Sequence, residues 1–595
     1  METERGTFFI GQAADGAPVL YDSADLTTHG VIVGMTGSGK TGLGITIIEE
    51  ALLNGIPCLV IDPKGDMGNL LLNFPDLSAA DFGPWIDEAE AERSDVTPDE
   101  LAAKTAATWK KGLADAGIDR ERLSRLREGA EMTIYTPGSG AGVGLNVLGS
   151  MKSPPLDWDT QAELIHDEIE SFVSSLLTLA GIEPDPVASP EHILLASIIE
   201  KFWREGRDLD LATLVGQVPK PPLRKLGVFD VDTFFPEKDR MALALRLNGL
   251  LASPSFAAWL EGVPLDIDEM LGGGKTKAAI VYLTHLSDAE RQFVVTLLLS
   301  KLVTWFRGLS GRADLRALIY MDEVFGFAPP TAEPPSKKPI LTLLKQARAH
   351  GVGMILSTQN PVDLDYKAMA NAGTWMVGRL QTENDKKRIL EGMESATGTV
   401  DVKSYDKLIS DLDKRQFVMS STRTAEPTVF SSRWAMSYLA GPLTRGQVSE
   451  LMEGARAGAE SSAPTSVAVP PDSGALSQPL EPIATDEVSV MPGVAEGVSS
   501  VFLHPAAPWS GEVGADPSGT RLQAGAVATV TLLYDDTTAG VNHSEVYEAV
   551  IHPLGMTLDP ESVREVDHDP RDFGDIAPDR ASYVLTEAKI DSKGY

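Results

Sequence analysis

The 595-residue sequence has little cysteine and no long hydrophobic run. Its single cysteine, Cys58, excludes a disulfide-based fold and a cysteine-rich zinc site. The most apolar stretch, residues 293–306, is interrupted by Ser300 and Lys301, so it cannot supply the roughly 18 apolar residues that span a bilayer. The N-terminal METERG also lacks the basic-then-apolar order of a signal peptide. We therefore expect a soluble cytoplasmic protein without membrane insertion.

Positive charge is also scarce, because 51 Lys and Arg stand against 85 Asp and Glu, for a net charge of −34. This balance argues against a protein that coats nucleic acid non-specifically. The charge is uneven, since residues 301–450 hold 20 basic and 16 acidic side chains and residues 451–595 hold 7 and 23. Two interpretations remain: an acidic surface that aids solubility, or an acidic exterior around a basic inner wall of a ring or groove.

Hydrophobic periodicity predicts an α/β fold with several parts. Buried-strand patterns alternate with helical patterns on either side of a long, mostly amphipathic helical stretch that Pro-rich segments punctuate. A segment without aromatic residues, dominated by Ala, Ser, Pro, Gly and Val, indicates a flexible linker. The predicted parts are a β lead-in at 1–28, an α/β core at 29–75 and 275–440, a mainly helical insertion at 76–274, the linker at 453–500, and a small C-terminal β-containing module at 505–595.

One motif carries phosphate chemistry. GMTGSGKT at residues 34–41 fits G-x-x-x-x-G-K-[ST], follows an apolar strand pattern and opens a predicted helix. Glycines let the backbone N–H groups and the helix N-terminus approach phosphate oxygens. Lys40 is expected to hold the β- and γ-phosphates, and Thr41 to offer its hydroxyl to Mg²⁺. The predicted nucleotide-binding residues are Gly34, Thr36, Gly37, Ser38, Gly39, Lys40, Thr41 and Gly42.

Two other glycine patterns compete with this one. Gly37-x-Gly39-x-x-Gly42 also fits the dinucleotide fingerprint, and Asp62 follows at the spacing of a ribose-binding acid. That interpretation leaves Lys40 and Thr41 without a role. The run GGGKT at residues 272–276 lacks the first glycine and leads into a strand, which indicates a turn.

A later strand pattern, residues 318–321, ends in Asp322 and Glu323. A phosphoryl-transfer site needs a carboxylate for the metal and a group that accepts a proton from water, and these two residues supply both. We expect Asp322 to bind Mg²⁺ and Glu323 to act as the base. The next strand pattern ends at Gln359, whose amide could sense the γ-phosphate or the water; a simple strand-end cap is the alternative. This order predicts a RecA-like sheet.

Together these stretches resemble the HerA/FtsK superfamily of ring-forming, DNA-pumping ATPases. The phosphate loop is the first, and IDPKGD at residues 61–66 resembles a box that HerA-like and conjugation-type ATPases share. The acid pair is the third, and QARAHGVGMILSTQ at residues 346–359 resembles the sensor strand. The resemblance covers residues 1–75 and 275–440. The lead-in is shorter than a HerA β-barrel, the insertion is large, and the last 90 residues match nothing in the family pattern.

The resemblance implies a hexamer that binds ATP and Mg²⁺ at subunit interfaces, DNA in a central pore, and an arginine from the neighbouring subunit. Arg379 is the first candidate for that arginine and Arg348 the second. Candidate DNA contacts are the lysines at 337–338 and the basic run at 386–388, with a solvated charged surface as the alternative. Phe325 and Phe327 are expected to be packed.

Three functions remain open from the sequence. The first is an ATP-driven DNA translocase or helicase-like motor. The second is a nucleotide-gated assembly or defence scaffold that recruits a protein effector through the C-terminal module. The third is a soluble ATPase of the secretion or conjugation type, which the box at residues 61–66 suggests. No HEXXH or LSGGQ-like motif is present, so a zinc protease and an ABC transporter are disfavoured.

Overall fold

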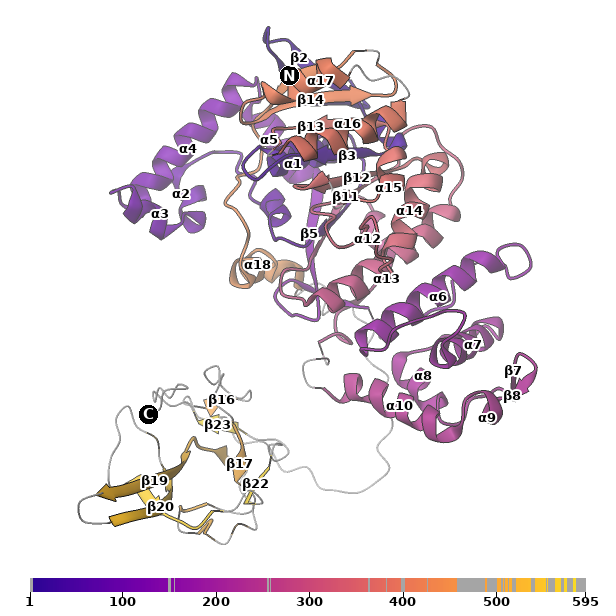
Figure 1. Cartoon of the computed structure of the whole chain (residues 1–595). Coiled ribbons are helices and arrows are strands. Elements are labelled where there is room, and N and C mark those ends of the chain that lie inside the picture. The colour runs from indigo at the N-terminus through magenta and orange to yellow at the C-terminus, as the bar shows by residue number, and fades with distance from the viewer. Residues whose placement is uncertain are drawn as a thin grey trace. The chain divides into compact units, whose positions relative to one another are not determined.

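The computed structural model describes most of residues 4–456 and short stretches between 487 and 584. Contacts divide the chain into two compact units, Met1–Ser466 and Val467–Tyr595, and each is described by itself (Figure 1). The predicted linker at 453–500 falls almost entirely outside the described residues. Undescribed residues are 1–3, 148–150, 155, 254–255, 257, 362–363, 381, 398–401, 425, 457–486, 489–499, 504–506, 508, 512, 516–520, 537–540, 553, 555–561, 569–571, 575–581 and 585–595.

The first unit is built on one large mixed sheet. Among the described residues its strand order is β2-β1-β15-β14-β13-β3-β12-β11-β4-β10-β5-β6-β9. The strands from β13 to β9 run parallel to their neighbours, whereas β14, β15, β1 and β2 add antiparallel pairs at one edge. Their bounds are β1 Thr7–Ala13, β2 Pro18–Asp22, β3 Gly30–Val33, β4 Cys58–Asp62, β5 Ala130–Pro137, β6 Val143–Asn146, β9 Val263–Pro264, β10 Thr276–Tyr282, β11 Ala317–Met321, β12 Val352–Thr358, β13 Thr374–Val377, β14 Gln416–Ser421 and β15 Thr428–Ser432.

Helices cover both faces of this sheet, and every residue of the central strands β3, β4, β11 and β12 is buried. Successive residues of β3 enter opposite cores: Val31 and Val33 lie in one hydrophobic cluster and Ile32 in the other. The same alternation separates Leu59 from Val60 in β4. The core helices are α1 Lys40–Leu53, α5 Arg120–Gly129, α12 Ile267–Leu271, α13 Asp288–Arg307, α14 Lys337–Gln346, α15 Tyr366–Ala370, α16 Glu383–Thr397, α17 Val402–Ser410 and α18 Arg445–Leu451.

The region predicted as a helical insertion, residues 76–274, differs from that description in one respect. It is largely helical, but β5, β6 and β9 extend the main sheet beyond β10. The lead-in at 1–28 is likewise part of the sheet, because β1 pairs with β15. Such pairings join residues far apart in sequence, and local periodicity carries no signal for them. The helices of this region are α2 Ala79–Phe82, α3 Glu88–Arg93, α4 Pro98–Asp115, α6 Ala162–Leu179, α7 Pro190–Arg204, α8 Leu211–Gln217, α9 Val231–Phe234 and α10 Glu237–Ala252.

Local signals explain where these helices begin. Thr97 caps α4 through a reciprocal pair with Glu100, and Ser189 caps α7, whose first residue is Pro190. In Figure 1, α6, α7, α8 and α10 lie together as a helical lobe, which α6 joins to the core through α13. No helix in the described ranges is both long and apolar enough to cross a membrane.

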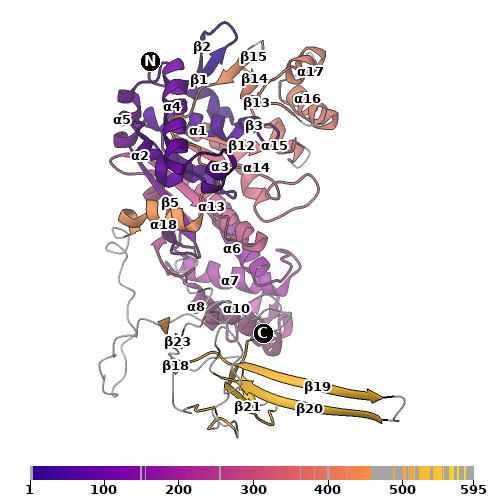
Figure 2. The same cartoon turned by 90° about the vertical axis from the view of Figure 1, so that its left-hand side faces the viewer.

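The second unit consists of small sheets. Its main element is a hairpin of β19 Ala526–Asp536 and β20 Val541–Ile551, to which β21 Val563–Glu565 adds. Figure 2 shows the hairpin as a long two-stranded ribbon. A small core packs under it and includes Trp509 and Val550. Several apolar side chains of the hairpin are exposed, including Leu533 and Val546. The remaining strands are β16 Glu487–Val488, β17 Phe502–Leu503, β18 Arg521–Leu522, β22 Phe573–Gly574 and β23 Ser582–Val584.

Candidate active site

The phosphate-loop motif lies at the carboxyl end of β3 and runs directly into α1. Gly37 and Gly39 have φ angles of 77° and 100°, a conformation that glycine adopts without strain. Neighbouring segments hold the loop in place: Met35 N donates to the carbonyl of Arg379 at 2.8 Å, and Arg415 N donates to the carbonyl of Ser38 at 2.8 Å. These two hydrogen bonds therefore anchor the loop at the carboxyl end of β3.

Two side chains of the loop are buried and point to an anionic ligand. Lys40 is only 6% exposed, and burial lowers its pKa, while the carboxylates of Asp322 and Glu323 oppose that shift. The hydroxyl of Ser38 is buried and has no hydrogen-bond partner among the described residues. A buried cation beside an unpaired hydroxyl and free backbone N–H groups suits phosphate oxygens.

The acid pair follows β11, which lies two strands away from β3, with β12 between them. Asp322 is 1% exposed, and the hydroxyl of Tyr320 lies 3.5 Å from its Oδ1. Burial raises the pKa of Asp322, and the charges of Lys40 and Lys64 counteract that rise. Its oxygens are thus available for a hard cation.

Those residues fit Mg²⁺ better than a metal held by protein alone. Among the residues that the structure describes, no group of three or more His, Cys, Asp or Glu could hold a metal. Mg²⁺ commonly binds through one or two protein groups together with substrate phosphates and water. Thr41 at the start of α1 and Asp322 at the end of β11 match that pattern.

Glu323 occupies a special backbone position and has three described partners. Its φ angle is 59°, which is strained for a residue with a side chain. Oε1 lies 3.1 Å from Thr358 Oγ1 and 3.4 Å from Gln359 N, and Oε2 lies 2.5 Å from Nζ of Lys64. The carboxylate is therefore fixed between the ends of β12 and β4.

Gln359 closes the link back to the phosphate loop. Its Oε1 accepts a hydrogen bond from Thr36 Oγ1 at 2.8 Å. The parallel register that pairs Thr358 with Val33 brings the sensor strand and the loop together at this end. The structure thus gathers the loop, Asp322, Glu323 and Gln359 at the carboxyl edge of one sheet, which is the ligand-binding edge of parallel α/β folds.

The box at residues 61–66 forms a tight turn after β4. The buried carboxylate of Asp62 accepts from the backbone N–H groups of Lys64 at 3.3 Å, Gly65 at 2.6 Å and Met67 at 3.0 Å. Burial, and secondarily Asp322, raises the pKa of Asp62 to about 7. Asp62 is thus occupied with its own turn and closed to a ribose, so the dinucleotide alternative finds no support. Sequence reasoning missed Lys64, although its place in the box was the available signal.

The two candidate arginines lie at opposite ends of the parallel strands, one at the carboxyl ends and one at the amino ends. Arg379 follows β13 beside the phosphate loop of its own chain, and its side chain is exposed. Arg348 is exposed in the 3₁₀ turn Ala347–His350, which precedes β12 and so lies at the amino edge. Another arginine, Arg415, contacts the loop directly and was not predicted; its guanidinium lies 4.8 Å from the ring of Trp434.

The predicted DNA contacts are changed by the structure. Lys337 is 2% exposed and pairs with Glu333 and Asp365, both at 2.9 Å, so the prediction that it binds DNA is wrong. The ion pair between Lys337 and Asp365 joins α14 to the loop after β12. Lys386 is also held, by Glu383 at 2.6 Å and Asp406 at 3.3 Å.

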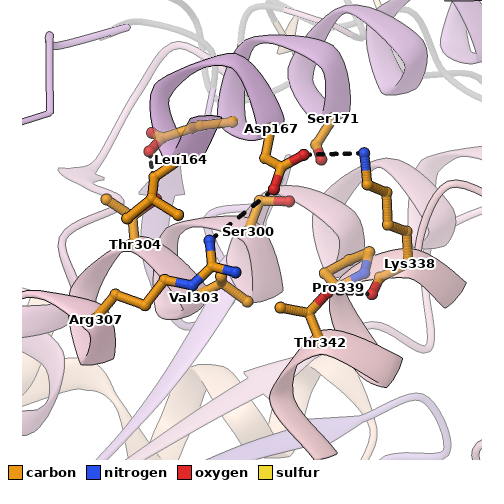
Figure 3. A pocket seen from close by; sticks show the side chains of 11 residues that line it. Leu164, Asp167, Ser171, Ser300, Val303, Thr304, Arg307, Lys338, Pro339 and Thr342 are labelled. Carbon is orange, nitrogen blue, oxygen red and sulfur yellow. Dashed lines mark hydrogen bonds and ion pairs between the residues drawn. The ribbon is translucent and has the colours of Figure 1, made fainter. Parts of the chain in front are cut away.

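The neighbouring Lys338 lines a small cleft between the helical lobe and the core (Figure 3). It pairs with Asp167 at 3.0 Å and Glu170 at 2.6 Å, both on α6. Arg307 of α13 reaches the same Asp167 from the other side, at 3.9 Å. These pairs join α6 to the core and leave Lys338 without a free charge for DNA.

The two phenylalanines after the acid pair differ in burial. Phe327 is 4% exposed, which confirms the prediction that it is packed. Phe325 is 63% exposed, so the same prediction was wrong for it. Gly326, between the two rings, has a positive φ angle of 83°. An exposed aromatic side chain therefore stands two residues from the acid pair.

The N-terminal part of the chain matches a known family model. Residues 8–111 match the family model of the central domain of the helicase HerA. Over those residues the chain is similar to the HerA central domain. The matched residues hold the phosphate loop and the box at 61–66, which carried the resemblance in sequence. The first unit has the mixed α/β fold expected from the sequence, with one strand, β12, between the acid-pair strand and the loop strand.

Other relatives share less. The type 4 coupling protein DotL of Legionella pneumophila is 37% identical over 60 residues, which span 10% of this chain and 8% of that protein. Among solved structures, VirB4 of Thermoanaerobacter pseudethanolicus has a TM-score of 0.42 at 12% identity and is matched over 72% of this chain and 97% of its own. The bacterial conjugative coupling protein TrwB has a TM-score of 0.42 at 12% identity, over 75% of this chain and 92% of its own.

Proposed function

We propose that this chain is an ATP-hydrolysing ring motor that translocates or unwinds DNA as a homo-oligomer, with a hexamer as the expected assembly. The observation that carries the proposal is the convergence of the phosphate loop, Asp322, Glu323 and Gln359 at one sheet edge. The match of residues 8–111 to the HerA central domain supports a DNA motor over other P-loop functions. The cytoplasmic location stays a prediction.

In the proposed reaction, the loop N–H groups and Lys40 bind the β- and γ-phosphates of ATP. Thr41 and Asp322 would hold Mg²⁺, which supplies charge neutralisation between these phosphates when it is bound. A water oxygen attacks the γ-phosphorus, the bond from that phosphorus to the bridging oxygen of ADP breaks, and Glu323 accepts a water proton. Gln359, oriented by Thr36, positions the water or the γ-phosphate.

The edge positions divide the roles of the two arginines. A ring with head-to-tail contacts places the phosphate-loop face of one subunit against a different face of the next. Arg379 lies beside its own loop, so we assign it to the nucleotide bound by the same chain. Arg348 lies at the opposite edge, where an arginine could reach a neighbour's γ-phosphate and stabilise charge in the transition state.

A secretion- or conjugation-type ATPase is the second candidate. The box at residues 61–66 favours it, as does the 37% identity over 60 residues to a coupling protein. A nucleotide-gated scaffold is the third, and the exposed apolar side chains of the β19–β20 hairpin are the feature that could recruit a protein effector. The scaffold predicts ATP turnover that does not respond to DNA.

The deciding experiment is the steady-state ATPase rate with increasing double-stranded DNA, at low and moderate salt. Lys40→Ala serves as the blank. Strong stimulation that weakens as salt rises supports the DNA motor, because contacts to the phosphate backbone release counterions. Turnover that is unchanged by single- or double-stranded DNA at either salt contradicts it and favours the scaffold.

A further inference from the structure

The ion pair between Lys64 and Glu323 occupies the group that the proposed reaction needs free. A general base must present an oxygen lone pair to water within hydrogen-bond reach. In this structure Oε1 of Glu323 faces Thr358 Oγ1 and Gln359 N, and Oε2 faces Nζ of Lys64 at 2.5 Å. Both carboxylate oxygens are thus engaged by donors of the same chain.

The turn after β4 positions Lys64 beside Glu323. Three backbone N–H groups bind the carboxylate of Asp62 and fix the turn that projects the lysine. Gly65 has a φ angle of 89°, and a Cβ at this position would lie 3.1 Å from the ring of Tyr282. The main chain around Lys64 is therefore rigid, and movement of its ammonium must come from its own four-carbon stem.

The Lys64 side chain has room to move, and a second carboxylate interacts with its charge. The side chain of Lys64 is 32% exposed, whereas that of Glu323 is 14% exposed. Asp66, on the same turn, is half-buried; burial raises its pKa, Asp322 adds to the rise, and the charge of Lys64 counteracts it. Lysine carries a compact charge on a flexible chain, so it can exchange one carboxylate for another.

We propose that Lys64 is a positioning residue that restrains the catalytic base: while Nζ pairs with Glu323 the base is held from water, and transfer of Nζ to Asp66 releases it. The inference rests on the proposed function, in which Glu323 takes the water proton. It deepens that function by naming the element that keeps hydrolysis low when the motor is idle. The two lysines of the site then differ, because Lys40 binds phosphate and Lys64 controls the base.

The test uses opposite effects of two substitutions in the full-length chain. Lys64→Met is expected to raise the ATPase rate without DNA by about twofold to fivefold, the range that loss of a partly exposed ion pair allows. The ratio of the DNA-stimulated to the unstimulated rate should fall accordingly. Asp66→Asn removes the second acceptor, so it should lower the rate, and the double variant should regain the rate of Lys64→Met.

Three controls separate the proposal from other roles of these residues. Lys104→Met, a solvent-exposed lysine on α4, should leave the rate unchanged. Lys64→Arg keeps a positive charge and should reverse most of the rise. Lys64→Met combined with Glu323→Gln should be as slow as Glu323→Gln alone, because the gain acts through the base. Thermal unfolding of each variant checks that it is folded.

A folded Lys64→Met protein with an unchanged or lower rate would overturn the restraint, and a lower rate would make Lys64 a phosphate-binding group. Failure of the double variant to recover would overturn the role of Asp66. These results differ from failure of the proposed function itself, in which Glu323→Gln hydrolyses ATP as fast as the parent chain. A parent chain without turnover that Lys64→Met does not activate contradicts both.

Discussion

Thr36 in the phosphate loop donates a hydrogen bond to Oε1 of Gln359, at 2.8 Å, across 323 residues of sequence. The contact ties the loop that binds phosphate to the strand end that adjoins Glu323. It fixes which end of the Gln359 amide faces the loop, so the amide N–H₂ is left to face the bound γ-phosphate or water. The first prediction concerns this amide.

We expect Gln359→Ala to lower kcat by about tenfold to a hundredfold with little change in nucleotide affinity, because the amide acts on the transition state more than on bound ATP. The measurement is steady-state turnover beside equilibrium binding of a non-hydrolysable ATP analogue. Gln346→Ala is the matched control, since that amide pairs with Arg307 at the other edge of the sheet. A loss of affinity equal to the loss of kcat would contradict the role.

A buried charge network behind α1 gives the second prediction. Arg433 pairs with Glu49 and Glu50, both at 2.9 Å, and all three side chains are fully buried. Arg433→Met leaves Glu49 without its cation and Glu50 paired with Arg122 alone, at 2.8 Å, and is expected to reduce the free energy of unfolding by about 3–5 kcal/mol. Urea unfolding measures it. Arg120→Met breaks an exposed pair with Asp76 and should cost far less; equal costs would contradict the assignment.

The third prediction concerns α1 and the acid-pair strand. A Cβ on Gly44 would lie 2.2 Å from the hydroxyl of Tyr320, which itself lies 3.5 Å from Asp322. Gly44→Ala should therefore destabilise the core by about 1–3 kcal/mol through overpacking. Gly249→Ala on α10 meets nothing within 4 Å and should be neutral or stabilising, as alanine is the better helix former. A neutral Gly44→Ala would show that α1 is not packed as described.

The fourth prediction is a pH dependence. Burial raises the pKa of Asp62 in the folded state to about 7, from an ordinary value of 3.8. The folded chain then binds more protons than the unfolded chain between these values, so this group makes stability fall as pH rises from about 4 to about 7. Asp62→Asn should make that fall shallower in urea titrations at several pH values without added Mg²⁺. An identical slope would contradict the shift.

Much of the central sheet and site could be predicted from sequence because their signals are local. The strand before Gly34, the helix that begins at Lys40 and the strand that ends at Asp322 each announce themselves by apolar runs and motif glycines. The parallel order then brings their carboxyl ends together. The role of Gln359 stays a prediction, although its side chain lies where that role requires.

What could not be predicted depends on distant partners. Nothing near Lys337 in sequence shows that it will be buried against Asp365, and nothing near Phe325 shows that its ring will be exposed. The pairing of β5 with β10 joins segments about 145 residues apart, so it leaves no trace in periodicity. Lys64 stood in a recognised box, yet only the fold reveals that Glu323 is its partner.

The most direct test of the central claim measures ATP binding and ATP hydrolysis on the same preparations of the parent chain, Lys40→Ala and Glu323→Gln, with Mg²⁺ and double-stranded DNA present. The account predicts that the parent binds and hydrolyses ATP, that Lys40→Ala loses binding, and that Glu323→Gln binds ATP but hydrolyses it at least about a hundredfold more slowly. Hydrolysis by Glu323→Gln at the parent rate would contradict the account.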